Sequence, residues 1–265
     1  MDATRPAAVA GFFYPGDAAI LAEQVRSYLA AAGTREHAPR PKAIIAPHAG
    51  YIYSGPVAAS VYARLGPLRG SVRRVVLAGP AHRVYVAGAA IPSVHAFASP
   101  LGAVPLDRDA LAALGKLAFV EVSDRAHAQE HSLEVHLPFL QSVLGQFALV
   151  PIVVGDAAPE EMAELFNAVW GGDETLIVVS SDLSHYLPYR SAQECDARTA
   201  QAIVGLEARL APNEACGAAP INGLLRAARA HALAAELVDL RNSGDTACDR
   251  ERVVGYGAFA FAAHG

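Results

Sequence analysis

The sequence predicts an α/β protein, a three-layer α/β/α sandwich with a mixed, mostly parallel sheet. Short, continuously apolar segments alternate with longer segments in which apolar residues recur at helical spacing. Strands that are apolar along their whole length are typical of a sheet covered by helices on both faces. The last two strand-like segments follow one another without a helix between them, which favours at least one antiparallel pair.

The first half of the chain begins with a helix predicted over Ala18–Ala32, where Asp17 is a suitable N-cap. Apolar strands are then expected at Ala43–Ala46, Arg74–Ala78, Ala89–Val94 and Phe119–Val122. Helices are expected near Pro56–Leu65 and Asp107–Leu117. A further helical segment covers much of Ser132–Leu144, and Pro138 must lie in its first turn or kink it, because proline lacks an amide hydrogen.

The second half repeats the alternation. Strands are expected at Ala148–Val154, Thr175–Ser180, Glu236–Leu240 and Val253–Phe261. Helices are expected at Pro159–Trp170, Ser191–Leu206 and Asn222–Leu233. The only loose stretch is Gly33–Pro41, and neither a linker nor an internal repeat divides the chain. We therefore expect one domain over residues 1–265.

Composition excludes several classes of protein. The net charge is −5 and no run of lysine or arginine occurs, whereas non-specific nucleic-acid binding needs a basic patch. No apolar run approaches the roughly 20 residues of a membrane span, and Ala7–Tyr14 lacks the features of a signal peptide. The three cysteines, Cys195, Cys216 and Cys248, are an odd number without CxxC spacing. A reducing cytoplasm is the expected compartment.

Polar residues follow three of the predicted strands. His48 comes after the first strand, His82 after the second, and Asp182 and His185 after the strand at Thr175–Ser180. Ligands of open α/β sheets bind at the carboxyl edge of the strands, so these residues are expected to converge there. Histidine is the commonest metal ligand and is suited to acid–base chemistry. The alternative for each histidine alone is a loop cap or a structural hydrogen bond.

The loop from His48 to Gly55 has two interpretations. Its glycines allow close approach of the backbone, and it opens a helix whose amides could hold an anion. It lacks the Walker lysine and the dinucleotide fingerprint, so a nucleotide site is not expected. The alternative is a tight strand-to-helix turn in which Tyr51 and Tyr53 pack locally.

A second polar cluster runs from Glu130 to His136. The order H-x-x-E-x-H does not match the zinc-protease motifs. On a continuous helix His131 and His136 would lie about 140° apart and could not ligate one ion. Glu130, His131 and Glu134 are interpreted as groups that support ligands or position a substrate, and the alternative is a solvated helix start.

Cys216 precedes a predicted helix, and a thiol near a helix N-terminus has a lowered pKa that favours the thiolate. The alternative is an inert, small apolar residue. Cys195 in a helix and Cys248 in a polar loop carry no functional prediction.

Taken together, these motifs resemble the Memo family. The resemblance is carried by A-P-H-A-G-Y at Ala46–Tyr51, G-P-A-H at Gly79–His82, E-H-S-L-E-V-H-L-P at Glu130–Pro138, S-S-D-L-S-H at Ser180–His185 and C-G-A-A-P-I at Cys216–Ile221. A-G-F-F-Y-P at Ala10–Pro15 and V-G-Y-G-A at Val254–Ala258 extend it over nearly the whole chain.

The resemblance implies a fold similar to that of class III extradiol ring-cleaving dioxygenases. It also implies that His48, His82 and Cys216 are metal ligands and that His185 stands where those enzymes have an acid–base histidine. Asp182, Glu130 and His131 would line the same pocket. Prokaryotic relatives often belong to the AmmeMemoRadiSam set, so a radical-SAM protein and an Amme-type protein are the implied partners.

Two departures limit what the resemblance carries over. The dioxygenases hold iron with two histidines and a carboxylate, whereas a thiolate would favour copper or zinc and alter the redox behaviour of iron. Some relatives have a second histidine where this chain has Arg83, and a basic residue with a histidine where it has Ala218 and Ala219.

Three functions are therefore expected in outline. The first is a metal-dependent oxidoreductase that uses Fe(II) or copper, with His185 as acid–base group. The second is a non-enzymatic adaptor that binds a peptide, a small molecule or a protein partner. The third, ranked behind them, is hydrolysis by a zinc-bound water. Neither the sequence nor the resemblance names a substrate.

Overall fold

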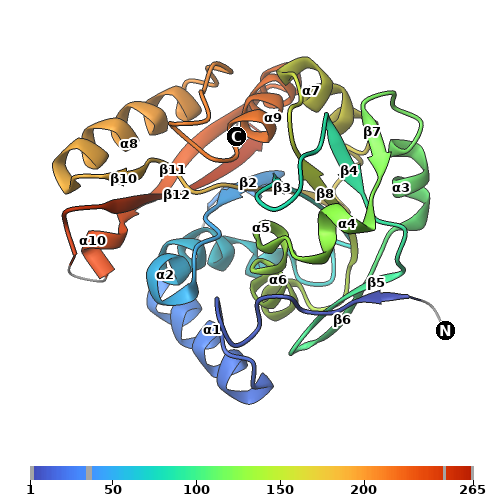
Figure 1. Ribbon diagram of the computed structural model, residues 1–265, viewed down its shortest axis with the longest axis horizontal. Coiled ribbons are helices and arrows are strands. Elements are labelled where there is room, and N and C mark those ends of the chain that lie inside the picture. The colour runs from blue at the N-terminus through green and yellow to red at the C-terminus, as the bar shows by residue number, and fades with distance from the viewer. Residues whose placement is uncertain (1–2, 34–37, 247–248, 264–265) are drawn as a thin grey trace.

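A computed structural model describes residues 3–33, 38–246 and 249–263 (Figure 1). The strands are β1 Thr4–Arg5, β2 Ala43–Ala46, β3 Arg74–Pro80, β4 Ala89–Ile91, β5 Ala96–Ser99, β6 Gly102–Pro105, β7 Val120–Val122, β8 Ala148–Val154, β9 Thr175–Ser180, β10 His185–Leu187, β11 Leu233–Asn242 and β12 Val253–Ala263. The helices are α1 Ala18–Ala32, α2 Tyr51–Tyr62, the 3-10 helix η1 Ala63–Leu68, α3 Arg108–Leu114, α4 Asp124–Ala128, α5 His131–Glu134, α6 Leu137–Leu144, α7 Pro159–Ala168, α8 Tyr189–Val204, α9 Ala218–Ala230 and α10 Ser243–Thr246.

A nine-stranded mixed sheet runs through the molecule in the order β10-β12-β2-β9-β3-β8-β4-β7, with β11 beside β12. Its centre is parallel, because β9 pairs in parallel with both β2 and β3, and β3 pairs in parallel with β8. Strands β12 and β4 join this centre in antiparallel fashion. Every residue of β2 and β9 is buried, as expected for strands covered on both faces.

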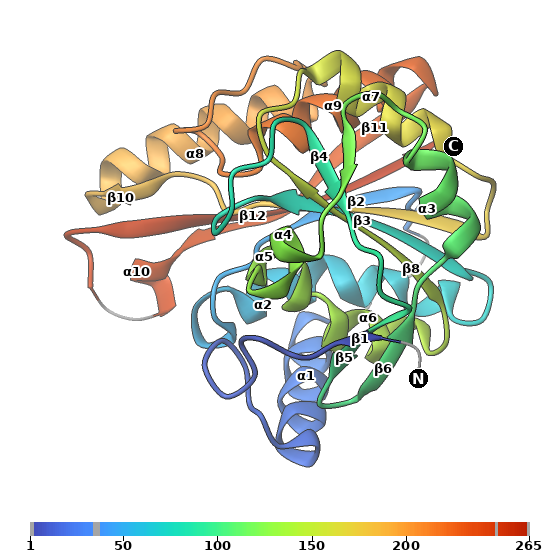
Figure 2. The same cartoon turned by 45° about the vertical axis from the view of Figure 1, so that its right-hand side comes forward.

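Helices cover both faces of this sheet. Helices α7, α8 and α9 lie on one face, and α1, α2, α5 and α6 lie on the other (Figures 1 and 2). Contacts of α8 and α9 with β11 and of α2 with β12 and β2 fix the two outer layers. The predicted three-layer α/β/α sandwich is confirmed. A small second sheet of β1, β5 and β6 packs at the edge of the molecule and was not predicted.

Element boundaries differ from prediction at α2, in the α5–α6 segment and at the start of β11. Helix α2 begins at Tyr51, and Pro56, which the pattern places at the helix start, lies inside it. A proline within a helix removes one hydrogen bond, and burial of the Val57 and Val61 side chains offsets that loss. The segment over Ser132–Leu144 forms two short helices, and Pro138 lies in the first turn of α6. Strand β11 starts at Leu233, where a helix end was expected.

Two sequence features fall wholly or partly outside the described residues, namely Cys248 and the middle of the Gly33–Pro41 stretch. Within the described part of the chain, no helix combines the length and apolarity that crossing a bilayer requires.

Candidate metal centre

The first imidazole of the centre is that of His48, which follows β2 and is oriented by residues at the end of the neighbouring strand β9. It is buried, and its backbone amide donates to Asp182 Oδ1 at 2.8 Å. Its Nδ1 lies 2.6 Å from Ser180 Oγ, and that hydroxyl donates its own hydrogen to the carbonyl of Ser132. Ser180 must therefore accept a hydrogen from Nδ1. This assigns the tautomer of His48 and leaves a lone pair on Nε2.

Glu130 orients the second imidazole in the same way. Its carboxylate accepts from the amide of His82 at 2.6 Å, from Nδ1 of His82 at 3.0 Å and from the amide of Ser132 at 3.0 Å. Burial opposes ionisation of Glu130, but these hydrogen bonds outweigh it and lower its pKa to about 2. A carboxylate only accepts, so Nδ1 of His82 carries the hydrogen and its Nε2 has the free lone pair.

His131 brings a third imidazole to the same place. The ring centroids lie 5.1 Å apart for His48 and His82, 5.5 Å for His48 and His131, and 4.6 Å for His82 and His131. One ring nitrogen of each lies within 4.8 Å of the others, so these three residues could hold a metal ion. Burial lowers the pKa of His131 to about 4 and lowers that of His48 as well. Both rings are neutral at neutral pH, as ligation requires.

Cys216 lies beside this group, with Sγ 3.3 Å from Nε2 of His48. A close approach of backbones places it there, because a Cβ on Gly217 would lie 2.6 Å from the carbonyl oxygen of Ser180. The sulfur accepts from the amide of Asp182 at 3.3 Å. The prediction of a lowered thiol pKa is wrong for the metal-free chain: burial and the nearby Asp182 raise the pKa of Cys216 to about 12. Only Gly217, the N-cap, separates Cys216 from α9, but burial outweighs the effect of the helix dipole on the thiol.

Asp182 and His185 lie on the β9–β10 side of the centre. Burial raises the pKa of Asp182 to about 7 even though the amides of His48 and Ala49 donate to it. His185 is half-buried, and its Nδ1 donates to the carbonyl oxygen of Leu183 at 2.8 Å, so its Nε2 also has a free lone pair. Burial lowers the pKa of His185. The next residue, Tyr186, has a φ of 59°, and a positive φ is uncommon for a residue with a large side chain. Tyr186 is also 62% exposed.

Comparisons with known proteins show the family to which this chain belongs. A family model described as Memo-like protein matches residues 5–260. The chain is 35% identical over 268 residues to a MEMO1 family protein of Aquifex aeolicus, a match that covers 95% of this chain and 97% of that protein. It is 37% identical over 280 residues to a MEMO1 family protein of Ignicoccus hospitalis, which covers 97% and 98% of the two chains. The chain belongs to the Memo family.

A solved structure adds evidence on the fold alone. An uncharacterized protein from Escherichia coli K12 superposes with a TM-score of 0.54 at 13% sequence identity, over 83% of this Memo chain and 100% of the other. The two proteins therefore share the mixed α/β architecture.

The residues of the polar cluster from Glu130 to His136 fall into two groups in this Memo chain. Some lie at the candidate metal centre, and the others form contacts that support the fold. Glu130 and His131 face the centre, whereas Glu134 is fully buried away from it. Glu134 accepts from the Arg5 guanidinium at 2.7 Å and from the Tyr14 hydroxyl at 2.6 Å. The other histidine of the cluster, His136, is bonded to the hydroxyl of Tyr62 and does not join the three imidazoles.

Sequence reasoning anticipated Glu130 as a group that supports the ligands, but it missed the residues that orient His48. Ser180 and Ser132 were noted only as parts of motifs, yet their hydroxyl and carbonyl fix the tautomer of His48. A serine that ends a fully buried strand is a signal that could have pointed to Ser180, because a buried hydroxyl needs a polar partner.

The donor set fits a transition metal. The imidazoles of His48 and His82 each use Nδ1 for a hydrogen bond inside the protein, which leaves the lone pair of Nε2 available to a metal. This is the usual arrangement of metal-bound histidines. The nearby thiol is a soft donor that suits copper, zinc or iron. The residues present therefore fit the metal that the Memo resemblance implies.

Proposed function

We propose that this chain binds one transition-metal ion through His48, His82 and Cys216 and acts as a metal-dependent oxidoreductase. The observation that carries the proposal is the group of three imidazoles at the carboxyl edge of β2 and β3, with the Cys216 sulfur 3.3 Å from His48 Nε2. Fe(II) and copper are the preferred metals, and zinc is the alternative, because a His₂Cys set is shared by all three. The bound ion would supply redox or Lewis-acid chemistry.

Three protein ligands leave a coordination position open, whereas four close the site. The family resemblance implies Cys216 as the third ligand, so we assign His131 to the pocket wall, next to Glu130, although its ring nitrogen lies within 4.8 Å of those of His48 and His82. The carboxylate of Glu130 holds His82 in its ligating tautomer and has a depressed pKa, so it stays anionic. His131 and Glu130 would thus face a substrate and would not coordinate the metal.

His185 is the proposed acid–base residue. Its Nδ1 is committed to the carbonyl of Leu183, so Nε2 is the atom that accepts a proton from a substrate and returns it. Burial lowers its pKa, which keeps the ring neutral and ready to act as a base near neutral pH. Asp182 holds the His48 backbone and contributes position rather than proton transfer.

The test is the metal content and oxygen uptake of protein purified without a metal-affinity tag. We expect near-stoichiometric iron or copper in the wild type, loss of the metal in His48→Ala and Cys216→Ser, and retention in His185→Gln. Oxygen uptake with added reductant should fall at least about 100-fold in His185→Gln, since general acid–base catalysis contributes 10²–10⁴-fold. Wild-type protein that stays metal-free after anaerobic reconstitution would refute the proposal.

A second candidate function is an adaptor, favoured by exposed apolar side chains near the centre. Phe12 is 88% exposed beside Phe13, whose ring contacts His131, and Tyr186 next to His185 is 62% exposed. A radical-SAM protein and an Amme-type protein are the partners proposed from the family resemblance, in the cytoplasm. An adaptor would show no oxygen uptake in the wild type. It would retain either partner in a pull-down with His185→Gln and release it with Phe12→Ser.

A further inference from the structure

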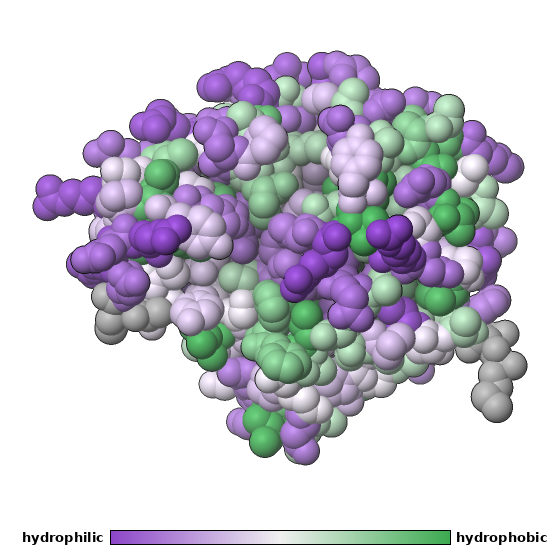
Figure 3. Space-filling view, viewed as in Figure 1, coloured by the Kyte–Doolittle hydropathy of each residue, from purple (hydrophilic) through white to green (hydrophobic). Residues whose placement is uncertain are grey.

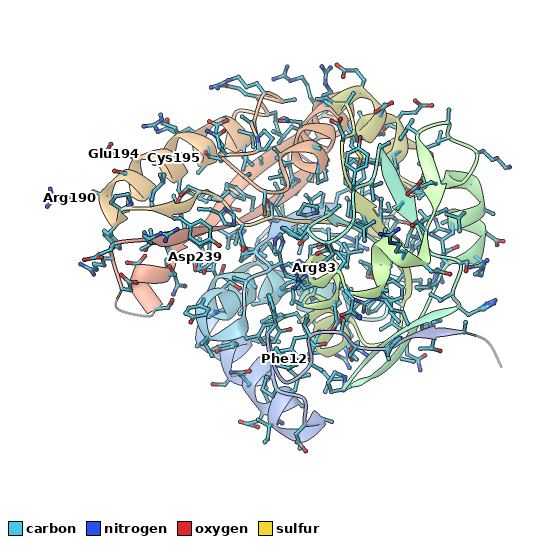
Figure 4. All side chains as sticks on the ribbon, viewed as in Figure 1. Phe12, Arg83, Arg190, Glu194, Cys195 and Asp239 are labelled. Carbon is cyan, nitrogen blue, oxygen red and sulfur yellow. The ribbon has the colours of Figure 1, made fainter. Side chains whose placement is uncertain are left out.

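Arg83 stands at the entrance to the candidate metal centre. It follows His82 directly, and the three hydrogen bonds from the His82 amide, the His82 ring and the Ser132 amide to Glu130 hold this part of the β3–β4 loop in place. Arg83 itself is exposed. In Figure 4 it lies over the middle of the molecule, and Figure 3 shows hydrophilic side chains gathered at that part of the same face.

The guanidinium of Arg83 has no hydrogen-bond or ion-pair partner in the described part of the chain. No hydrogen bond or ion pair involves it among the residues that the structure describes, in contrast to Arg5, Arg64 and Arg74, which bind carboxylates. Five donor hydrogens are therefore available at the pocket entrance. The charge of Arg83 also reaches the pocket wall: after burial and the neighbouring His82, it is a further cause of the low pKa of His131.

The two carboxylates of the centre, Glu130 and Asp182, are each bonded to other groups and do not pair with Arg83 in the described part of the chain. Glu130 is occupied by His82 and Ser132. Asp182 is buried and occupied by the backbone of His48. The guanidinium of Arg83 is thus left without a carboxylate partner among the described residues, although Glu130 is anionic nearby, and a metal ion would add further positive charge.

We propose that Arg83 binds an oxyanion, a carboxylate or a phosphate group, of the ligand that enters this pocket. The inference rests on the proposed function, because it assigns the ligand class of the same site. A guanidinium presents a planar fork that matches two oxygens of either anion, which gives orientation as well as affinity. Arg83 would hold the anionic end of the ligand while the remainder extends towards His82 and His131.

The rest of the ligand is expected to be organic. Tyr85, in the same loop, is 78% exposed, and Phe12 lies on the same face as Arg83 in Figure 4. Exposed rings next to a cation suit a molecule with one charged end and an apolar body. Benzoate is therefore a suitable probe, with benzamide as its uncharged counterpart and inorganic phosphate as the second anion.

The test measures dissociation constants of benzoate, inorganic phosphate and benzamide by protein-observed NMR titration at low ionic strength. Zinc-loaded wild type is compared with Arg83→Gln, Arg83→Lys and Arg190→Gln, and the zinc content of every sample is determined. Arg190 is the matched control because it is also exposed but lies far from Arg83 at the start of α8 (Figure 4).

We expect an anion to bind wild type more tightly than benzamide, and Arg83→Gln to weaken that anion at least about tenfold, as loss of a charge-assisted hydrogen bond predicts. Arg83→Lys should retain part of the affinity and Arg190→Gln all of it. Preference for benzoate identifies a carboxylate ligand, and preference for phosphate identifies a phosphate ester.

Anions that bind wild type no better than benzamide, or equally well to wild type and Arg83→Gln, overturn the inference even where the metal is present. If no sample holds zinc but anion binding still depends on Arg83, the metal proposal fails and the inference on Arg83 stands.

Discussion

At the scale of single residues, hydrogen bonds decide which nitrogen of each histidine is free to bind a metal. Ser180 accepts from Nδ1 of His48, and Glu130 accepts from Nδ1 of His82, so both rings direct Nε2 away from these partners. A neutral imidazole has two tautomers of similar energy, and a buried acceptor selects one of them. The protein has therefore set the ligating form of both residues before a metal arrives.

Ser180→Ala tests this directly. The substitution removes the hydrogen-bond acceptor that orients His48. Loss of such a partner of a metal-bound histidine typically lowers metal affinity 10–100-fold, so the metal dissociation constant should rise by about tenfold or more. Competition with a chelator of known affinity measures it. Ser60→Ala is the control, because the Ser60 hydroxyl bonds only to the Val57 carbonyl within α2. Equal metal affinity in both variants would contradict the assignment.

A buried histidine outside the centre predicts how stability depends on pH. Burial lowers the pKa of His127 to about 4, and its Nε2 donates to the carbonyl of Ala90 at 3.0 Å. The unfolded chain binds this proton near pH 6.5 and the folded chain does not, so stability is lost as pH falls below 6.5. The loss from His127 alone should be about 2 kcal/mol between pH 7 and pH 5.

Urea titrations at these two pH values measure the effect. His127→Gln should reduce the difference between the two unfolding free energies by about that amount. An unchanged difference would show that His127 does not titrate as its burial indicates.

At the scale of elements, the N-terminal segment supports the helix that carries His131. Arg5 reaches Glu134 at 2.7 Å and also donates to the carbonyls of His127 and Glu130. Both partners of the ion pair are buried, with exposures of 4% for Arg5 and 0% for Glu134. The segment before α1 is thereby tied to the loop that orients Glu130 and α5.

Glu134→Ala should therefore lower the free energy of unfolding by about 3–5 kcal/mol, because it leaves the Arg5 charge buried without a partner. Thermal or urea unfolding measures the change. Glu23→Ala, which breaks the exposed pair with Arg26, should cost less than about 1 kcal/mol. A loss of similar size in both variants would show that the buried pair does not support α5.

How far the sequence predicts the fold also depends on the element. The strands β2, β3 and β9 are continuous apolar runs, and this pattern predicts buried strands of a mostly parallel sheet. Their order, with β9 between β2 and β3, is known only from the structure. The start of α2 depends on tertiary packing that overrides the local signal of Pro56, whereas Pro138 lies in the first turn of α6, as predicted. The Arg5–Glu134 pair joins residues 129 positions apart, and no periodicity reveals such a contact.

The candidate site was predicted in part. The positions of His48, His82 and His185 follow from the ends of apolar strands. The approach of His131 does not, because it depends on how the short helix α5 packs against β3. The raised pKa of Cys216 could not be predicted either. The sequence places the thiol near a helix N-terminus, but it does not show that the thiol is buried.

At the scale of the whole molecule, the fold does not depend on the metal. The central strands are buried by apolar side chains over their whole length, and the imidazoles lie at one edge of the sheet. Removal of the metal with a chelator should leave the far-ultraviolet circular dichroism unchanged. The Tm should fall by a few degrees, because a bound ligand stabilises by RT ln(1 + [L]/Kd). Unfolding on chelation would instead identify a structural metal.

The ligand set of the metal centre is tested most directly by X-ray absorption at the edge of the bound metal, in wild type, Cys216→Ser and His131→Ala. The account predicts nitrogen scatterers together with one sulfur scatterer at about 2.3 Å in the wild type. The sulfur signal should disappear in Cys216→Ser and persist unchanged in His131→Ala. A wild-type spectrum without sulfur, together with loss of a nitrogen scatterer in His131→Ala, would contradict it and assign the metal to His48, His82 and His131.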